Sequence, residues 1–333
     1  MASGAVRKRE DDTAWKGHTM ILVTGGLGFI GTHTVRALLD LDEDCVVVQR
    51  RARDLPAFLD ESRVAVEQAD ITDRDALPAI GRRHAITGIV HLAGSYPWPP
   101  VPDAPVEATR RALGGLLNIA QAAQEWGVRR LGVASTIGVY FGAGHDGPLR
   151  EDAPLPMSAP ASIPTFKKVG ELLGGFLADT TGVDIVNYRV SGTWGPLGHR
   201  DPFFAGPALV HAAARGTVPD LSHLMAPAFA EDGLDLNYVK DTGRAIALLQ
   251  LAETLKHRTY NVGSGRATTN AQLVEAIRTV VPDARIDLPR GGTAPHMVLD
   301  TSRLQEDTGY RPDYDTERAA ADYIAWLRAG HEN

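Results

Sequence analysis

The sequence has a single cysteine, Cys45, so it cannot form a disulfide bond within the chain. A lone cysteine fits a reducing compartment, and its place at the start of the apolar run 45–48 indicates a buried structural thiol. No stretch reaches the roughly 18 apolar residues that a membrane helix requires, and the N-terminus has no apolar segment resembling a signal peptide. We therefore expect a cytoplasmic protein with no membrane partner.

A large excess of one charge is also missing, because the net charge is only −7 in 333 residues. Nothing in this balance favours nucleic acid as a partner, and we predict no metal site. Hydrophobic residues make up 44% and charged residues 23%, which is enough apolar material for a sizeable core. The expected partner is a small-molecule substrate.

Short apolar runs alternate with helical patterns along most of the chain, which is typical of an α/β fold with a parallel sheet built from βαβ units. We predict a Rossmann-type, doubly wound parallel sheet with a smaller, interleaved C-terminal substrate-binding region. Helical spacing of apolar residues appears at 29–39, 113–125 and 316–328. The expected strands cover 20–24, 45–49, 65–68, 88–92, 130–134, 184–189 and 259–262.

The domain organisation follows from this order of elements. Residues 1–19 are polar and without pattern, and we treat them as a disordered arm or tag. We assign 20–190 to a dinucleotide-binding domain, with 235–263 returning to it, and 191–234 and 264–333 to a substrate-binding cap. Loops that follow strands of an open parallel sheet line its ligand crevice. The expected walls of the site are the Pro- and Gly-rich stretches 94–105, 142–164 and 195–207.

The first expected strand runs into a glycine-rich turn with Gly25, Gly28 and Gly31, and a helix follows. Glycine permits positive φ and close approach of a ligand to the backbone. A helix N-terminus offers N–H donors to a pyrophosphate. The strand, the turn and the helix together favour a dinucleotide site over a purely structural turn.

The turn Thr24-Gly25-Gly26-Leu27-Gly28-Phe29-Ile30-Gly31 resembles the fingerprint of the extended short-chain dehydrogenase/reductase family, the NAD-dependent epimerases and dehydratases. The resemblance covers nearly the whole chain from Met20. Further matching blocks, in order, are Asp70-Ile71, His91-Leu92-Ala93-Gly94, Ala134-Ser135-Thr136 with Val139-Tyr140-Phe141-Gly142, Arg189 with Gly195-Pro196, Tyr238-Val239-Lys240-Asp241, and Tyr260-Asn261-Val262-Gly263-Ser264-Gly265.

This resemblance implies an NAD(P)-binding enzyme that acts on a small hydroxyl- or carbonyl-bearing substrate. It also implies a homodimer formed through the helices around 113–125 and 166–178. The cofactor-binding residues that it implies are Gly25, Gly28, Phe29, Ile30, Gly31, Asp70, Ile71, Leu92, Ala93, Gly94 and Lys167.

The end of the second strand departs from the NAD-binding pattern. Relatives that bind NAD usually carry an acidic residue there for the ribose hydroxyls, but this strand ends Val48-Gln49-Arg50-Arg51. Arginine suits a 2′-phosphate because its guanidinium can form paired, charged hydrogen bonds. We therefore favour NADP over NAD, with Arg50 and Arg51 at the phosphate.

The catalytic motif departs further. The family uses a Ser or Thr, a Tyr, and a Lys four residues after the Tyr, and the Lys lowers the pKa of the Tyr. Thr136 takes the hydroxyl position, and Lys167 takes the lysine position because it stands four residues before Glu171. The tyrosine position is then Ile163, and no tyrosine occurs between Tyr140 and Tyr188.

Other positions near the substrate also differ from the family. Ala112 and Gly192 stand where relatives carry asparagine, and the second change weakens the case for a sugar nucleotide. Arg290 resembles the family arginine that binds a diphosphate, although a solvated surface arginine fits equally. Tyr96 and Trp98 could face the nicotinamide, with Tyr96 as a proton donor, or could pack beneath the Pro-rich loop.

Three functions stay open at this point. The first is an NAD(P)-dependent epimerase, dehydratase or reductase with a non-standard proton donor in place of Tyr. The second is a redox-inactive regulatory protein that binds the dinucleotide. The third is a non-redox lyase or cyclase that reuses the pocket. The glycine turn, Thr136 and Lys167 favour an enzyme, and the missing Tyr favours the second and third functions over the first.

Overall fold

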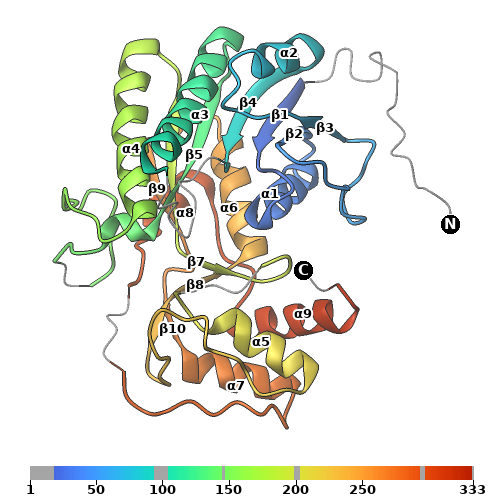
Figure 1. Cartoon of the computed structure of the whole chain (residues 1–333), viewed down its shortest axis with the longest axis vertical. Coiled ribbons are helices and arrows are strands. Elements are labelled where there is room, and N and C mark those ends of the chain that lie inside the picture. The colour runs from blue at the N-terminus through green and yellow to red at the C-terminus, as the bar shows by residue number, and fades with distance from the viewer. Residues whose placement is uncertain (1–18, 94–103, 145–146, 199–202, 293–296, 332–333) are drawn as a thin grey trace.

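A computed structural model describes residues 19–93, 104–144, 147–198, 203–292 and 297–331. Figure 1 shows a large sheet flanked by helices, with a smaller region built around α5, α7 and α9 at one end of it. None of the described helices has the length and apolar character needed to cross a membrane.

The large sheet has seven parallel strands in the order β3-β2-β1-β4-β5-β6-β9. The order reverses between β1 and β4, and this switch point is where open α/β sheets bind ligands. This confirms the predicted Rossmann-type sheet. The strands are β1 (Thr19–Thr24), β2 (Asp44–Gln49), β3 (Val64–Gln68), β4 (Ala85–His91), β5 (Arg130–Thr136), β6 (Ile185–Val190) and β9 (Thr259–Val262).

Helices cover both faces of this sheet because alternate strand residues are buried on opposite sides. Ile21 and Val23 of β1 face one apolar cluster, and Met20 and Leu22 face another. The first cluster lies under α1 (Phe29–Asp40) and α6 (Val239–Leu251). The second lies under α2 (Ala76–Arg83), α3 (Pro105–Trp126) and α4 (Ser162–Thr181).

The smaller region has its own sheet and core. Its strands, in the order β10-β8-β7, are Ala267–Thr269, Gly233–Tyr238 and Gly192–Trp194. Three helices pack against one another beside this sheet: α5 (Gly206–Arg215), α7 (Asn270–Val280) and α9 (Thr316–Arg328). Thr269 and Gln272 form a capping box that fixes the start of α7.

Two parts of the predicted domain division differ in the structure. The short helix α8 (Ser302–Thr308), assigned to the cap, contacts β9 and α6 and buries Leu304 in the core of the large sheet. The strand β8, within the segment assigned to the large sheet, belongs to the small sheet. A seven-residue helix with one buried leucine carries too little pattern to show which core receives it.

Candidate active site

The glycine turn joins β1 to α1 at the switch point of the sheet. Gly25 has φ 69°, a left-handed conformation that favours glycine, and its carbonyl accepts the N–H of Gly28 at 2.9 Å. A Cβ on Gly31 would lie 2.0 Å from the carbonyl oxygen of Gly25, so the helix can approach the turn only with glycine there. The turn therefore brings the first N–H groups of α1 to the crevice.

Gly28 differs from Gly25 and Gly31 because the surrounding protein leaves space for a side chain at its Cα. Its φ is −82°, which any residue can adopt, and a Cβ there would meet only the carbonyl of Gly25, at 3.1 Å. No side chain caps the N-terminus of α1 within the described part of the chain. This open cradle at a helix N-terminus fits a pyrophosphate.

Two side chains that the sequence reasoning missed hold this turn. The Gln49 carboxamide faces the N–H groups of Gly26 and Leu27, and the amide orientation that satisfies both places its oxygen 2.9 and 2.5 Å from them as the acceptor. Arg53 Nη1 donates to the carbonyl of Leu27 at 2.7 Å. Arg50 and Arg51 are exposed beside them. For Gln49 the sequence did hold a clue, because this residue stands where NAD-binding relatives carry an acid. Nothing in the sequence indicated that Arg53 would contact the turn.

The ends of β1 and β4 are joined by the Thr24 hydroxyl. Thr24 Oγ1 lies 2.8 Å from His91 Nδ1 and accepts the N–H of Ala93 at 3.2 Å, while Leu92 N–H donates to the Thr24 carbonyl. Burial, with a smaller effect of the Lys167 charge, lowers the pKa of His91 to about 3. His91 is therefore neutral at pH 7 and holds the two strand ends together.

Asp70 and Ile71 lie where the chain leaves β3 and meets α3. Asp70 Oδ1 accepts the N–H and hydroxyl of Thr72, at 3.0 and 2.8 Å, and Arg111 Nη2 lies 3.1 Å from Oδ2. Partial burial opposes ionisation, but the two hydrogen bonds from Thr72 outweigh it and lower the pKa of Asp70. The carbonyl of Ile71 accepts from Asn118 of α3 at 2.9 Å.

Thr136 ends β5, and its hydroxyl accepts the N–H of Gly138 at 3.2 Å at the start of the 3-10 helix η1 (Ile137–Tyr140). The helix α4 packs on both β5 and η1, which brings its first turns to the Thr136 end of the strand. Ile163, half-buried, is the second residue of α4. The residue that the sequence aligns with the family tyrosine therefore lies on a helix that packs on the strand ending at Thr136.

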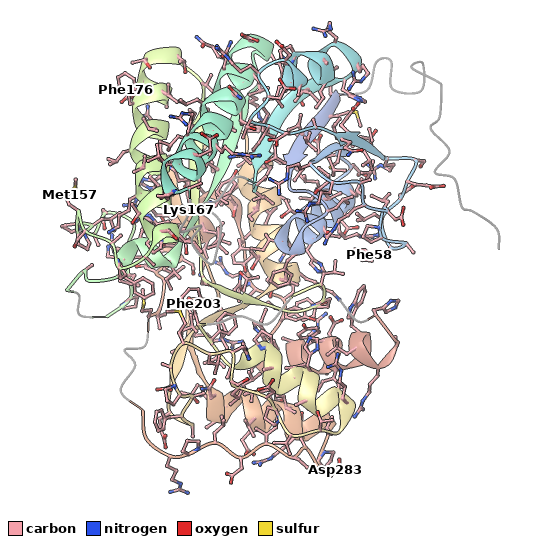
Figure 2. All side chains as sticks on the ribbon, viewed as in Figure 1. Phe58, Met157, Lys167, Phe176, Phe203 and Asp283 are labelled. Carbon is pink, nitrogen blue, oxygen red and sulfur yellow. The ribbon has the colours of Figure 1, made fainter. Side chains whose placement is uncertain are left out.

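The two lysines of α4 point to different surroundings. Lys167 Nζ donates to the carbonyl of Ala134 at 2.6 Å, toward the end of β5, and Figure 2 labels this residue in the half of α4 nearer the small sheet. Lys168 Nζ donates to the carbonyls of Pro156 and Ser158 in the preceding loop. Adjacent helix residues point about 100° apart, so one lysine faces the strand ends and the other fixes the loop.

Lys167 also borders a small cavity of about 40 Å³, enough for ordered water beside its polar lining groups. Burial of the ammonium lowers the pKa of Lys167 to about 8, while Glu171 opposes the shift. Ser135 donates to Glu171, and Glu171 pairs with Arg189 at 2.7 Å. The cavity is lined by His91, Ala112, Ser135, Lys167, Glu171 and Asn187, among others.

Two apolar side chains, Pro164 and Phe141, lie close to Thr136. A Cβ on Gly138 would lie 3.1 Å from Pro164, 3.3 Å from Phe141 and 3.5 Å from Thr136, so these three side chains meet at one point. Phe141 is 40% exposed and Met157 92% exposed. Figure 2 shows Met157 projecting from the loop beside α4.

Residues that lead into the smaller region pack against β8 and against α1. A Cβ on Gly192 would lie 2.8 Å from Leu234 and 3.2 Å from Leu236, so leucines of β8 fill the space of a side chain there. His33 Nε2 donates to the carbonyl of Pro196 at 2.9 Å, and a Cβ on Gly198 would touch the Phe29 ring at 3.0 Å. The segment 195–198 thus rests on the first turns of α1.

Of the remaining predicted site residues, only Arg290 lies within the described part of the chain, and it is not brought to this centre. Arg290 is exposed on a segment of the smaller region that hydrogen-bonds to residues 230–231, and it does not line the cavity beside Lys167. Gly94, Tyr96 and Trp98 lie outside the described residues. Among the residues that are described, no cluster of His, Cys, Asp or Glu is arranged to hold a metal ion.

Comparison with known proteins gives the same family as the motifs. A model described as the NAD dependent epimerase/dehydratase family matches residues 21–263. The UDP-glucose 4-epimerase of Azospirillum brasilense is 28% identical over 329 residues, which cover 93% of this chain and 92% of the relative. The dTDP-glucose 4,6-dehydratase of an Actinoplanes species is 29% identical over 331 residues, covering 93% and 98%.

Solved structures give the same fold at low identity. The UDP-glucose 4-epimerase of Thermotoga maritima with UDP-glucose has a TM-score of 0.76 at 23% identity, covering 94% of this chain and 99% of that one. The enzyme of Thermus thermophilus in complex with NAD has a TM-score of 0.74 at 24% identity, covering 93% and 99%.

Proposed function

This chain belongs to the NAD-dependent epimerase/dehydratase family, and we propose that it is an NADP-dependent member acting on a substrate less polar than a sugar nucleotide. In this proposal the substrate carries a hydroxyl or carbonyl group, and a group other than tyrosine handles the proton. The observation that carries the proposal is an open, uncapped turn at Gly28, which can receive a pyrophosphate, together with an α4 that turns Lys167 toward the end of β5 but has isoleucine at position 163.

The cofactor would be held by the turn at Gly25, Gly28 and Gly31 and by Lys167. When bound, a nicotinamide dinucleotide supplies or accepts a hydride. The preference for NADP rests on the end of β2, where Gln49 faces the turn with its carboxamide and no acidic residue follows Val48 in the segment 49–53. Arg50, Arg51 and Arg53 lie exposed in the next four positions and can supply charged hydrogen bonds to a 2′-phosphate.

Few groups are left to donate or accept the proton that accompanies hydride transfer, because the isoleucine side chain at position 163 can do neither. We propose Thr136 acting through water, Tyr96, or the substrate itself as the proton donor. Lys167 supports this chemistry as a partly desolvated ammonium whose pKa, lowered to about 8, lies close to neutral pH. Its neighbours Ser135 and Glu171 around the small cavity would keep water near it.

A less polar substrate agrees with the surroundings of Thr136. Phe141 is 40% exposed near Thr136, and the half-buried Ile163 lies on the helix that packs on β5 and η1. Apolar surface of this kind gains free energy when a matching ligand group covers it. At Gly192, Leu234 and Leu236 take the space in which a family asparagine would project. The site therefore offers little to the polar groups of a sugar and more to a hydrocarbon part.

The missing tyrosine also favours a second candidate, a protein that binds the dinucleotide without using it for net redox chemistry. Such a protein would be a regulator, or a lyase or cyclase that reuses the pocket. Thr136 and Lys167, which we align with the catalytic hydroxyl and lysine of the family, favour the first candidate.

We further propose a homodimer that forms through α3 and α4, which contact each other on one face of the sheet in Figure 1. Leu117, Leu172 and Phe176 on these helices are 45%, 67% and 63% exposed. Large apolar side chains gathered on neighbouring helices are typical of an interface.

The test is to measure NADP and NAD binding by titration calorimetry and then to screen hydroxyl and carbonyl compounds for a change at the reduced-nicotinamide absorbance band. Tighter binding of NADP, with turnover of apolar compounds, supports the proposal. Tight dinucleotide binding without turnover of any compound favours the redox-inactive candidate. Equal affinities, or tighter NAD, would exclude the NADP preference.

A further inference from the structure

A second cavity lies between α1, α6 and α9, and none of its lining residues borders the small cavity beside Lys167. Its volume is about 600 Å³, within the usual size of small-molecule pockets, which form preferentially where two domains meet. The large sheet supplies α1 and α6, and the small region supplies α9. Its lining includes Arg36, Asp40, Phe58, Lys240, Arg244 and Trp326.

Aromatic rings from three separate segments form one wall of this cavity. Phe58 stacks on His33 of α1, with ring centroids 6.1 Å apart and planes at 22°. It also meets Trp326 of α9 edge to face, at 5.7 Å. Phe58, labelled in Figure 2, thus lies between α1 and α9. Such a wall can receive a further ring by stacking or by edge-to-face contact.

The charged groups of the lining balance one another. Each of its three cations pairs with a carboxylate, and Asp241 accepts the backbone N–H groups of Asp313 and Tyr314 at 2.9 and 3.0 Å. The lining carboxylates are Asp40, Asp241 and Asp313, which equal the cations in number. The three pairs are Arg36–Asp40, Arg244–Asp313 and Lys240–Asp322, with N···O distances of 2.6, 2.9 and 2.7 Å.

This balance decides what kind of ligand the cavity fits. A phosphate or carboxylate ligand would bring net negative charge to a lining in which a carboxylate already pairs with each cation, so no excess positive charge is left to bind it. A net cation would need a spare carboxylate, and the lining carboxylates are used by cations or backbone N–H groups. A zwitterionic or uncharged ligand needs neither an excess cation nor a spare carboxylate, so the lining suits such a ligand.

The geometry points to a second ligand site for a planar aromatic molecule without net charge, separate from the dinucleotide crevice. The ligand ring packs on Phe58 and Trp326. Its polar groups reach the paired charges at the rim, where Arg36 and Arg244 have donors beyond those used on Asp40 and Asp313. The site is independent of the proposed reaction, because no residue of the dinucleotide turn takes part.

The test uses four compounds that share an indole ring and differ in charge: indole-3-acetamide, tryptophan, indole-3-acetate and tryptamine. Binding to the full chain is followed by saturation-transfer NMR. We expect indole-3-acetamide or tryptophan to bind at least about tenfold more tightly than indole-3-acetate and tryptamine. Saturable binding by none of the four, or tightest binding by either of the charged compounds, would overturn the proposal.

Two variants locate the binding. Phe58→Ala removes the ring between α1 and α9 and should weaken binding about tenfold, the usual scale of a lost aromatic contact. Ala37→Phe, on α1, fills the cavity from its wall and should abolish binding even if Phe58→Ala folds poorly. Phe176→Ala, on α4, is the control and should bind as the unchanged protein does. Unchanged affinity in a folded Ala37→Phe variant would place the ligand elsewhere.

Discussion

Replacing Gly28 with valine should destroy dinucleotide binding while leaving the protein folded. The backbone of Gly28, at φ −82° and ψ 178°, suits a β-branched residue, and a Cβ there meets only the Gly25 carbonyl at 3.1 Å. The expected loss of stability is about 1 kcal/mol, the scale of an altered helix N-cap. The added side chain instead projects into the cradle where a pyrophosphate would lie.

The size of the binding loss follows from the hydrogen bonds that the side chain would block. A hydrogen bond to a charged group contributes about 1.5–3 kcal/mol. Loss of two such bonds from the turn to a pyrophosphate therefore weakens binding by more than about a hundredfold. Titration calorimetry with NADP gives the affinity, and urea unfolding gives the stability of the same sample.

Gly31→Ala is the matched control for this variant. A Cβ on Gly31 would lie 2.0 Å from a backbone oxygen, so the helix must shift, and overpacking of this kind costs about 1–3 kcal/mol or more. Gly31→Ala should therefore lose more stability than Gly28→Val. Wild-type affinity in Gly28→Val would refute the placement of the pyrophosphate over this turn.

Three other predictions concern α4 and its neighbours. Lys167→Ala should weaken dinucleotide binding far more than Lys168→Ala, and calorimetry showing the reverse would overturn the assignment of Lys167 to the cofactor. Burial lowers the pKa of Lys167 to about 8 from 10.5, so the unfolded chain binds more protons between these pH values. The unfolding free energy of wild type relative to Lys167→Met should then rise by up to about 3 kcal/mol from pH 8 to pH 10.5; a flat difference in urea titrations would contradict this. Phe176→Asp with Leu172→Asp should give monomers in sedimentation, and an unchanged dimer would place the interface elsewhere.

The sequence predicted the large sheet well because its strands are apolar on both faces. All seven expected strands are present, and the ends of most differ by one to three residues. The start of α3 was less visible, since the helix begins at Pro105 and its first turns, such as Val106, are exposed rather than apolar on one face. The spacing of apolar residues reveals a helix only where one face is buried, so an exposed helical turn leaves no such pattern in the sequence.

The local geometry followed from the sequence where the backbone demands a residue type, as at Gly25 and Gly31 in the glycine turn. The four-residue spacing to Glu171 also indicated that Lys167, rather than Lys168, shares the face of α4 turned toward β5; its role at a cofactor stays a prediction. Contacts between distant segments were not predictable. Arg53 on the Leu27 carbonyl, Leu234 against Gly192, and the cavity between α1 and α9 all depend on how separate elements pack.

The central claim, that this chain keeps the dinucleotide site but has lost the tyrosine acid, is tested most directly at Ile163. The measurement is a cofactor-linked turnover assay on UDP-sugars and small alcohols, with Ile163→Tyr beside the wild type. Losing general acid–base help costs roughly a hundred- to ten-thousand-fold in rate. We therefore predict negligible turnover by the wild type and a gain in the tyrosine variant. Wild-type turnover of about 1–1000 per second on these substrates would contradict the account.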